Sequence, residues 1–173
     1  MRLFFALWPD EGVRAQLTRW SKELHAVCGG RATRTENLHL TLAFLGEVDD
    51  LRIAEIARAA GEVTPRAATL VLDQPGYWKR NHIAWAGASV VPAGLGEMVR
   101  ELRDALARSR IDFDPKEFVS HVTLLRDARE PRAMPELKTV RWELDGFVLV
   151  RSPIERGGGP YEVLNSWRLR RRR

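Results

Sequence analysis

The sequence contains a single cysteine, Cys28, among its 173 residues. One thiol can form neither an internal disulfide nor a cluster of thiolate ligands, which excludes a disulfide-stapled secreted scaffold and a cysteine-rich zinc site. A reducing compartment fits this composition, so we expect the protein in the cytoplasm. The sequence also lacks a long hydrophobic run, because the apolar residues 3–8 are too few to cross a bilayer and no signal-peptide cleavage pattern follows them. We therefore expect no membrane partner.

The sequence has little net charge outside its last residues. The formal net charge is +5, from 28 Lys and Arg against 23 Asp and Glu, and Arg168 with Arg170 to Arg173 supplies five positive charges. The rest of the chain is therefore neutral overall, and total charge gives no argument for a nucleic-acid partner. We interpret residues 168–173 as a solvated, Arg-rich tail. With 45% hydrophobic and 29% charged residues, the composition is that of an ordinary folded protein.

Hydrophobic spacing predicts the same order of strand, helix and strand twice along the chain. Leu3 aligns with Ile83 and His39 aligns with His121, at offsets of 80 and 82 residues. The first copy has a strand at residues 3–8, a helix from Pro9 to Gly29 with the apolar stripe Val13, Leu17, Trp20, Leu24 and Val27, and a strand at residues 38–45. The second copy has a strand at residues 83–86, a helix after Pro92 with the stripe Leu95, Met98, Val99, Leu102 and Leu106, and a strand at residues 119–125.

This repeat predicts the fold class. We expect an α+β fold of two similar lobes, each a mainly antiparallel sheet flanked by helices, related by a pseudo-twofold axis with a central cleft where the equivalent strands meet. Residues 1–173 should form a single domain, because no change of composition marks a boundary. The remaining predicted elements are a helix after Asp49, strands at residues 70–72, 140–144, 147–150 and 161–169, and a flexible stretch at residues 156–160.

One connection stays open at this stage. Asp145-Gly146 between the strands at residues 140–144 and 147–150 indicates either the turn of a hairpin or a bulge within one strand.

Two short motifs carry the chemistry, His39-Leu40-Thr41 and His121-Val122-Thr123. With four His and eight Thr in the chain, about 0.2 such His-x-Thr triplets are expected by composition. Two are present, and they stand at corresponding positions of the repeat. Because strand side chains alternate between faces, each histidine should share a face with its threonine while the intervening residue enters the core. The two motifs therefore predict one joint site.

Two imidazoles and two hydroxyls suit transfer at a phosphodiester. Such a reaction needs a base for the incoming oxygen, an acid for the departing oxygen and donors for the nonbridging oxygens. Arg126 follows the second motif, and its planar guanidinium can bind two phosphate oxygens at once. Phe44 stands at the equivalent place after the first motif, where it is suited either to line the site or to fill the core.

On these residues the sequence resembles the two-histidine phosphoesterase superfamily, and within it the RNA 2′,3′-cyclic phosphodiesterases, historically called 2′-5′ RNA ligases. The resemblance covers nearly the whole chain. It is carried by the first strand, residues 2–7, and by the extended motifs His-x-Thr-x-x-Phe at residues 39–44 and His-x-Thr-x-x-Arg at residues 121–126.

The resemblance implies hydrolysis of an RNA 2′,3′-cyclic phosphate to a 2′-phosphate without a metal or other cofactor. It gives His39 the part of general acid and His121 the part of general base, with Thr41, Thr123 and Arg126 binding the phosphate. The implied partners are RNA ends that carry a cyclic phosphate, tRNA fragments among them, and we expect a monomer. Reversible 2′-5′ ligation belongs to the same resemblance.

Other interpretations remain open from the sequence. Tyr77 and Trp78, followed by Lys79-Arg80, could stack a terminal base, or could form a loop with a half-buried tryptophan. A noncatalytic RNA-binding module would use the same aromatic and basic residues, although pure binding does not require two matched histidines. Within the superfamily, ADP-ribose 1″,2″-cyclic phosphate or a 2′-5′-linked oligonucleotide are alternative substrates.

Overall fold

The computed structural model describes residues 1–153 and 159–170. The predicted stretch at residues 156–160 and the tail at residues 168–173 thus lie partly outside the described residues. The helices are α1 (Glu11–Cys28), α2 (Ile53–Ala60) and α3 (Ala93–Arg108), with short 3-10 turns at Thr35–Asn37 and Asp50–Arg52. The strands are β1 (Arg2–Leu7), β2 (Arg31–Ala32), β3 (Leu40–Glu47), β4 (Ala68–Leu72), β5 (Gln74–Trp78), β6 (Ile83–Gly87), β7 (His121–Arg126), β8 (Val140–Leu144), β9 (Gly146–Ser152) and β10 (Glu162–Arg168).

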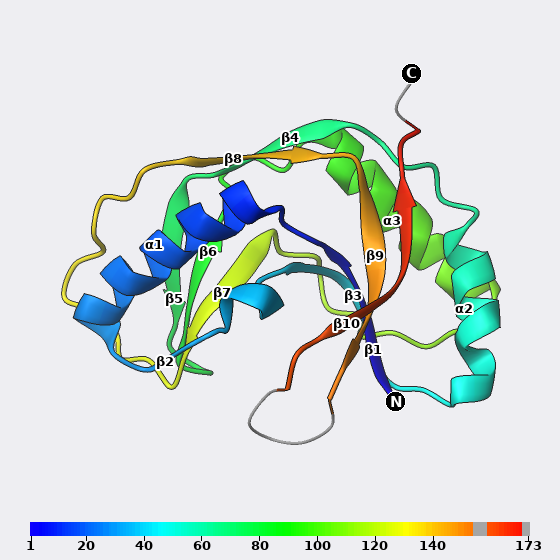
Figure 1. Ribbon diagram of the computed structural model, residues 1–173, viewed down its shortest axis with the longest axis horizontal. Coiled ribbons are helices and arrows are strands. Elements are labelled where there is room, and N and C mark those ends of the chain that lie inside the picture. The colour runs from blue at the N-terminus through cyan, green and yellow to red at the C-terminus, as the bar shows by residue number, and fades with distance from the viewer. Residues whose placement is uncertain (154–158, 171–173) are drawn as a thin grey trace.

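The strands form two four-stranded sheets and one separate pair (Figure 1). One sheet has the order β10-β9-β1-β3, the other has the order β2-β7-β6-β5, and β4 pairs with β8. Every pairing is antiparallel. The predicted α+β class with antiparallel sheets is confirmed. No helix in the described parts of the chain is long and apolar enough to cross a membrane.

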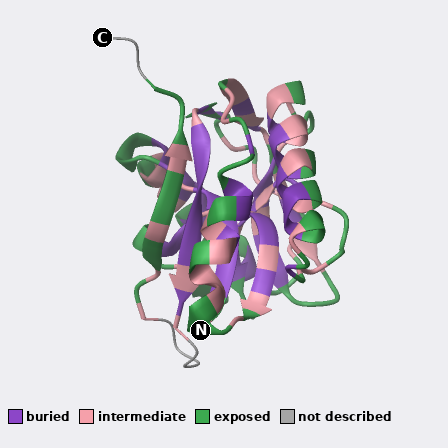
Figure 2. Ribbon diagram, turned by 90° about the vertical axis from the view of Figure 1, so that its right-hand side faces the viewer, coloured by how far each residue is buried: buried purple, intermediate pink, exposed green. Residues whose placement is uncertain are grey.

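The helices of the two repeats are exchanged between the sheets. Helix α1 follows β1 in the chain but packs against β6 and β7 of the other sheet, while α3 follows β6 and packs against β3 (Figure 1). Each repeat therefore depends on the other to cover its sheet. The main hydrophobic core accordingly runs without a break from one sheet to the other, as the buried segments in Figure 2 show.

Helix α1 is fixed at both ends by its own sequence. The Asp10 carboxylate accepts a hydrogen bond from the Val13 backbone N–H at 2.8 Å, which caps the helix start. Gly29 ends the helix with a φ of 61°, a left-handed conformation that favours glycine. The predicted stripe is buried except at its last position. Val27 is 45% exposed and Cys28 takes its place in the core, because the buried stripe runs on from Leu24 at a spacing of four rather than three.

The connection at Asp145-Gly146 is neither a hairpin nor a bulged strand. Strand β8 pairs with β4, whereas β9 pairs with β1 and β10, so the chain changes sheets between them. A Cβ atom at Gly146 would lie 1.9 Å from the backbone oxygen of Trp167. Only glycine permits this close approach of two strands. The glycine that looks like part of a turn motif in the sequence is therefore required by tertiary packing.

Candidate active site

The first motif lies on β3 and the residue just before it. The pairing of β3 with β1 shifts by one residue at Leu42, which therefore forms a β-bulge. Leu42 and Ala43 are both buried, so the alternation of faces changes phase there. The bulge returns Phe44 to the face that carries His39 and Thr41, which explains the two-residue gap in His-x-Thr-x-x-Phe.

The second motif on β7 has the same construction. Its pairing with β6 shifts at Leu124, and Leu124 and Leu125 are both buried. Arg126 is consequently exposed on the face of His121 and Thr123 instead of pointing into the core. The corresponding bulges thus place the third residue of each extended motif on the same strand face as its histidine.

Both imidazoles are held in the same way. The Nδ1 atom of His39 lies 2.7 Å from the Asn37 carbonyl oxygen, and the Nδ1 atom of His121 lies 3.0 Å from the Val119 carbonyl oxygen. Because a carbonyl only accepts, Nδ1 carries the hydrogen in both rings and Nε2 is left as the reactive nitrogen. In His39, Nε2 lies 3.1 Å from the Thr41 hydroxyl.

The two motifs act on each other electrostatically. The pKa of His39 is lowered to about 4, chiefly by burial and also by the positive charges of His121, Arg126 and Arg14, while its hydrogen bond to the Asn37 carbonyl acts to raise it. Burial also lowers the pKa of His121, and the positive charge of Arg126 lowers it as well. Strands β3 and β7 are in contact although they belong to different sheets. The structure therefore brings the two motifs together from opposite halves of the repeat.

Aromatic rings surround each histidine. The ring centre of His39 lies 4.6 Å from Phe4, 6.2 Å from the nearly parallel Trp8 and 5.6 Å from Tyr161. Phe44 packs on the same sheet face, against the small apolar cluster Phe4, Ala6, Val148 and Val150. The Arg2 guanidinium lies 5.1 Å from the Phe44 ring centre. The histidine face of this sheet is therefore largely apolar.

On the other sheet, Trp78 ends β5 with its ring centre 4.5 Å from His121 and 5.4 Å from Trp85. Tyr77 lies apart from this group because the neighbouring residue of a strand points to the opposite face. Its hydroxyl donates to the Ala128 carbonyl oxygen at 3.0 Å, and its ring packs against the main core. The structure thus connects His39, Thr41, His121, Arg126 and Trp78 with one another, places Phe44 and Thr123 on the strands of the two motifs, and separates Tyr77 from them.

Sequence reasoning missed several residues that contact His39. Asn37 is buried, and its side-chain oxygen accepts a hydrogen bond from the Tyr161 backbone N–H at 3.0 Å. The Trp8 ring also lies near this histidine, and the positive charge of Arg14 on α1 acts on it. The position of Asn37 two residues before His39 was a local signal, but nothing in the sequence places Arg14 or Tyr161 near the motif.

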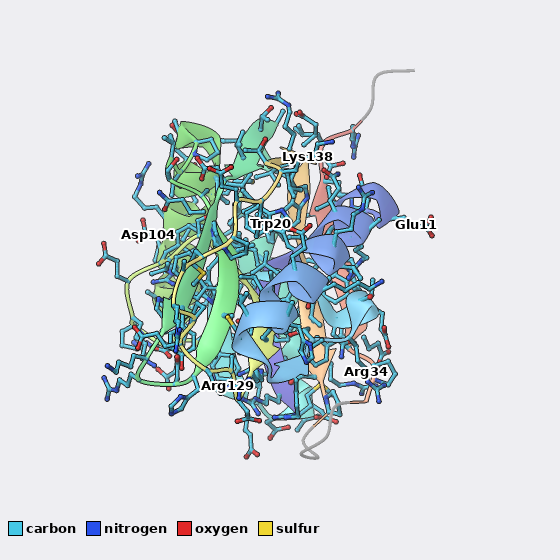
Figure 3. The ribbon with its side chains drawn as sticks, turned by 90° about the vertical axis from the view of Figure 1, so that its left-hand side faces the viewer. Glu11, Trp20, Arg34, Asp104, Arg129 and Lys138 are labelled. Carbon is cyan, nitrogen blue, oxygen red and sulfur yellow. The ribbon has the colours of Figure 1, made fainter. Side chains whose placement is uncertain are left out.

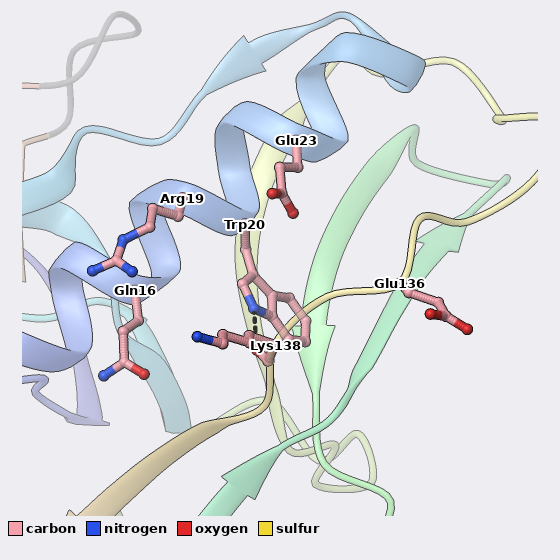
Figure 4. A pocket seen from close by; sticks show the side chains of 6 residues that line it. All are labelled: Gln16, Arg19, Trp20, Glu23, Glu136 and Lys138. Carbon is pink, nitrogen blue, oxygen red and sulfur yellow. Dashed lines mark hydrogen bonds between the residues drawn. The ribbon is translucent and has the colours of Figure 1, made fainter.

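A hollow of about 340 Å³ lies elsewhere, between α1 and the segment that leads into β8 (Figures 3 and 4). The Trp20 indole N–H donates to the Lys138 carbonyl oxygen at 2.8 Å across it. Its other lining residues are Gln16, Arg19, Glu23 and Glu136. None of the motif residues lines this hollow, and its charges are mixed, so it is not the candidate active site. Within the described residues, no three His, Cys, Asp or Glu side chains cluster as metal ligands.

Comparisons with known proteins agree on one family. The family model of LigT-like phosphoesterases matches residues 7–85. The chain is 36% identical to an Escherichia coli protein named RNA 2′,3′-cyclic phosphodiesterase, over 97% of this chain and 96% of that protein. A Thermus thermophilus protein of the same name is 33% identical, over 98% and 91%. The crystal structure of E. coli LigT complexed with 3′-AMP superposes with a TM-score of 0.84 at 35% identity, covering 98% of each chain. The chain therefore belongs to the LigT-like phosphoesterase family of two-histidine enzymes.

Proposed function

We propose that the protein hydrolyses 2′,3′-cyclic phosphates at RNA ends to 2′-phosphates, using His39 as general acid and His121 as general base. The observation that carries this proposal is the matched pair of imidazoles, each fixed through Nδ1 by the carbonyl two residues earlier. The names of the relatives, and a related structure complexed with 3′-AMP, support a nucleotide phosphate as substrate.

The reaction follows from the two Nε2 atoms, which the Nδ1 hydrogen bonds leave without a hydrogen. Neutral His121 takes a proton from water as the water oxygen bonds to phosphorus, and the bond from phosphorus to the 3′ oxygen breaks. Protonated His39 gives its proton to that departing oxygen. The product carries a 2′-phosphate and a 3′-hydroxyl, and the proton pair returns to its starting arrangement by exchange with water. These protein groups supply both proton transfers, so we propose that no metal or other cofactor takes part.

The other motif residues bind the substrate. Thr41 and Thr123 donate hydrogen bonds to the nonbridging oxygens, and Arg126 stabilises the negative charge that develops on them. Phe44 and Trp78 supply apolar contact for the nucleoside, since aromatic rings beside a phosphate site are suited to stack bases. Tyr77 contributes indirectly at most, because its hydroxyl is bonded on the core side of β5.

Substrate binding should also lead His39 to take up the proton that a general acid needs. At neutral pH the lowered pKa values leave both imidazoles uncharged in the free protein. A bound phosphodiester anion next to His39 favours the imidazolium, because an opposite charge at short range stabilises the charged form. We therefore propose that His39 gains its proton together with the substrate.

We further propose that residues 1–173 act as one domain and as a monomer, in the cytoplasm, on RNA ends such as those of tRNA fragments. The same site would also catalyse reversible 2′-5′ ligation of RNA. A 5′-hydroxyl gives its proton to His121 and attacks phosphorus in place of water, and the bond from phosphorus to the 3′ oxygen breaks as His39 protonates that oxygen. The product carries a 2′-5′ linkage and a free 3′-hydroxyl.

A short RNA ending in a 2′,3′-cyclic phosphate tests the proposal directly. The expected product is the 2′-phosphate, formed equally with and without excess chelator. Parallel reactions with a 2′-5′-linked dinucleotide and with ADP-ribose 1″,2″-cyclic phosphate compare the alternative substrates. Binding without ring opening would point instead to an RNA-binding module. Activity that is lost with chelator and restored by a divalent ion would overturn the metal-free mechanism.

A further inference from the structure

Arg14 connects helix α1 to the segment that carries His39. Its Nη1 atom donates to the carbonyl oxygens of Thr35 at 2.5 Å and Leu38 at 3.1 Å. Its Nε atom donates to the Pro9 carbonyl oxygen at 3.1 Å. One guanidinium therefore joins the end of β1 to the residues immediately before the first motif. The planar fork of arginine suits such a role because it presents several donors in fixed directions.

Within the described residues the half-buried Arg14 guanidinium forms no direct ion pair, although the carboxylates of Glu36 and Asp10 act on its charge from a greater distance. The guanidinium carbon lies 4.8 Å from the Trp8 ring centre, and Nη2 is buried without a hydrogen-bond partner. A partly buried cation without a direct ion pair costs free energy, and here its backbone hydrogen bonds, the Trp8 ring and the more distant carboxylates stabilise it.

The groups around His39 show where that charge acts. The charges of His121 and Arg126 on β7 and of Arg14 on α1 act on the imidazole. The Asn37 carbonyl accepts a hydrogen bond from it, and Tyr161 before β10 lies 5.6 Å from its ring centre. After burial, the positive charges of His121, Arg126 and Arg14 all act to keep the ring neutral in the free protein. Arg14 is the member of this set that also anchors the backbone before His39.

We propose that Arg14 is a positioning residue for His39, fixing the segment that carries it and adding a positive charge that acts on its ring. This inference rests on the proposed function only for its kinetic consequences. The anchoring orients Nε2 toward the departing oxygen. The charge keeps the empty site free of a proton on His39 and adds to the field that attracts an anionic substrate.

Arg103 of α3 offers a matched control. It is also half-buried, donates to the Leu42 carbonyl oxygen at 3.2 and 3.3 Å and to the Lys116 carbonyl oxygen at 2.8 Å, and lies 5.7 Å from the Phe113 ring centre. It thus anchors the β3 backbone from the other side of the motif. Unlike Arg14, it is not among the charges that act on His39.

The test compares Arg14→Met, Arg14→Lys and Arg103→Met with the native protein. Nuclear magnetic resonance titration of the imidazole nitrogens measures the pKa of His39 without requiring activity, and kcat is measured on the cyclic-phosphate RNA across pH. Arg14→Met should raise the pKa of His39, because it removes a positive charge. Arg14→Lys should leave that pKa near the native value. Both should lower kcat by about tenfold, since both lose the fork that orients the ring.

Arg103→Met should leave the pKa of His39 unchanged, and melting curves show which variants remain folded. The proposal is overturned if Arg14→Met leaves the pKa at its native value, or if Arg103→Met moves it by the same amount. Native kcat in both Arg14 variants would likewise overturn the anchoring role. If the native protein does not hydrolyse the cyclic phosphate, the proposed function is contradicted instead, and the titration still decides the role of Arg14.

Discussion

Protonation of His39 should be costly in the folded protein, and its cost can be calculated. The pKa of about 4, against 6.5 for an exposed histidine, corresponds to about 3.4 kcal/mol. The unfolded chain binds a proton near pH 6.5 and the folded chain does not until about pH 4. Folding stability from this group is therefore complete above pH 6.5 and falls by up to about 3.4 kcal/mol as the pH decreases through 4.

Urea unfolding of the native protein and of His39→Gln, at pH 7.5 and at pH 4, measures this contribution. The native protein should lose more stability on acidification than the variant, and the excess should approach about 3 kcal/mol. Other titrating groups contribute to both proteins and cancel in the difference. His25→Gln, which changes an exposed histidine of α1, is the matched control and should behave as the native protein does. Equal acid sensitivity in the native protein and His39→Gln would refute the proposed desolvation of the ring.

Four further predictions concern the reaction and its scaffold. His39→Ala and His121→Ala should each lower kcat on the cyclic-phosphate RNA by about 10²-fold or more while the protein stays folded, and near-native turnover in either would contradict the acid–base pair. The native profile of kcat/KM against pH should be bell-shaped with its maximum below pH 6.5, because both histidine pKa values are lowered. Arg126→Lys should lower the height of that bell and leave its limbs in place, whereas Arg126→Gln should also shift both limbs to higher pH, because its charge lowers both pKa values. Gly87→Ala would place a Cβ atom 2.5 Å from the Trp85 ring and should reduce the free energy of unfolding by about 1–3 kcal/mol; unchanged urea denaturation would show that the ring can move aside.

The local elements were predictable because their signals are local. The capping carboxylate of Asp10 and the left-handed Gly29 bound α1, and the apolar spacing located its buried face. The same holds for α3, whose predicted stripe is entirely buried. Strand alternation likewise predicted that each motif histidine would share a face with its threonine. These conclusions need only nearest-neighbour geometry and the tendency of apolar side chains to leave water.

The site required more than that. A regular strand would turn the third residue of each extended motif into the core, and only the bulges at Leu42 and Leu124 return Phe44 and Arg126 to the histidine face. Register shifts depend on the partner strand, so one strand read alone cannot reveal them. Tyr77 was wrongly grouped with Trp78, because adjacent residues of a regular strand point to opposite faces of the sheet.

The sequence by itself determined the two motifs, their repeat and the reaction class that they suit. Only the tertiary structure decided how the halves combine: α1 crosses to the second sheet, and Asn37 binds the backbone of Tyr161, 124 residues later in the chain. It also decided the electrostatics, because burial and the charges of Arg14 and Arg126 set the pKa of His39. The physical reason is that the residue type determines which chemical groups a side chain has, whereas its solvation and the electrostatic field around it depend on all the chain segments that pack against it.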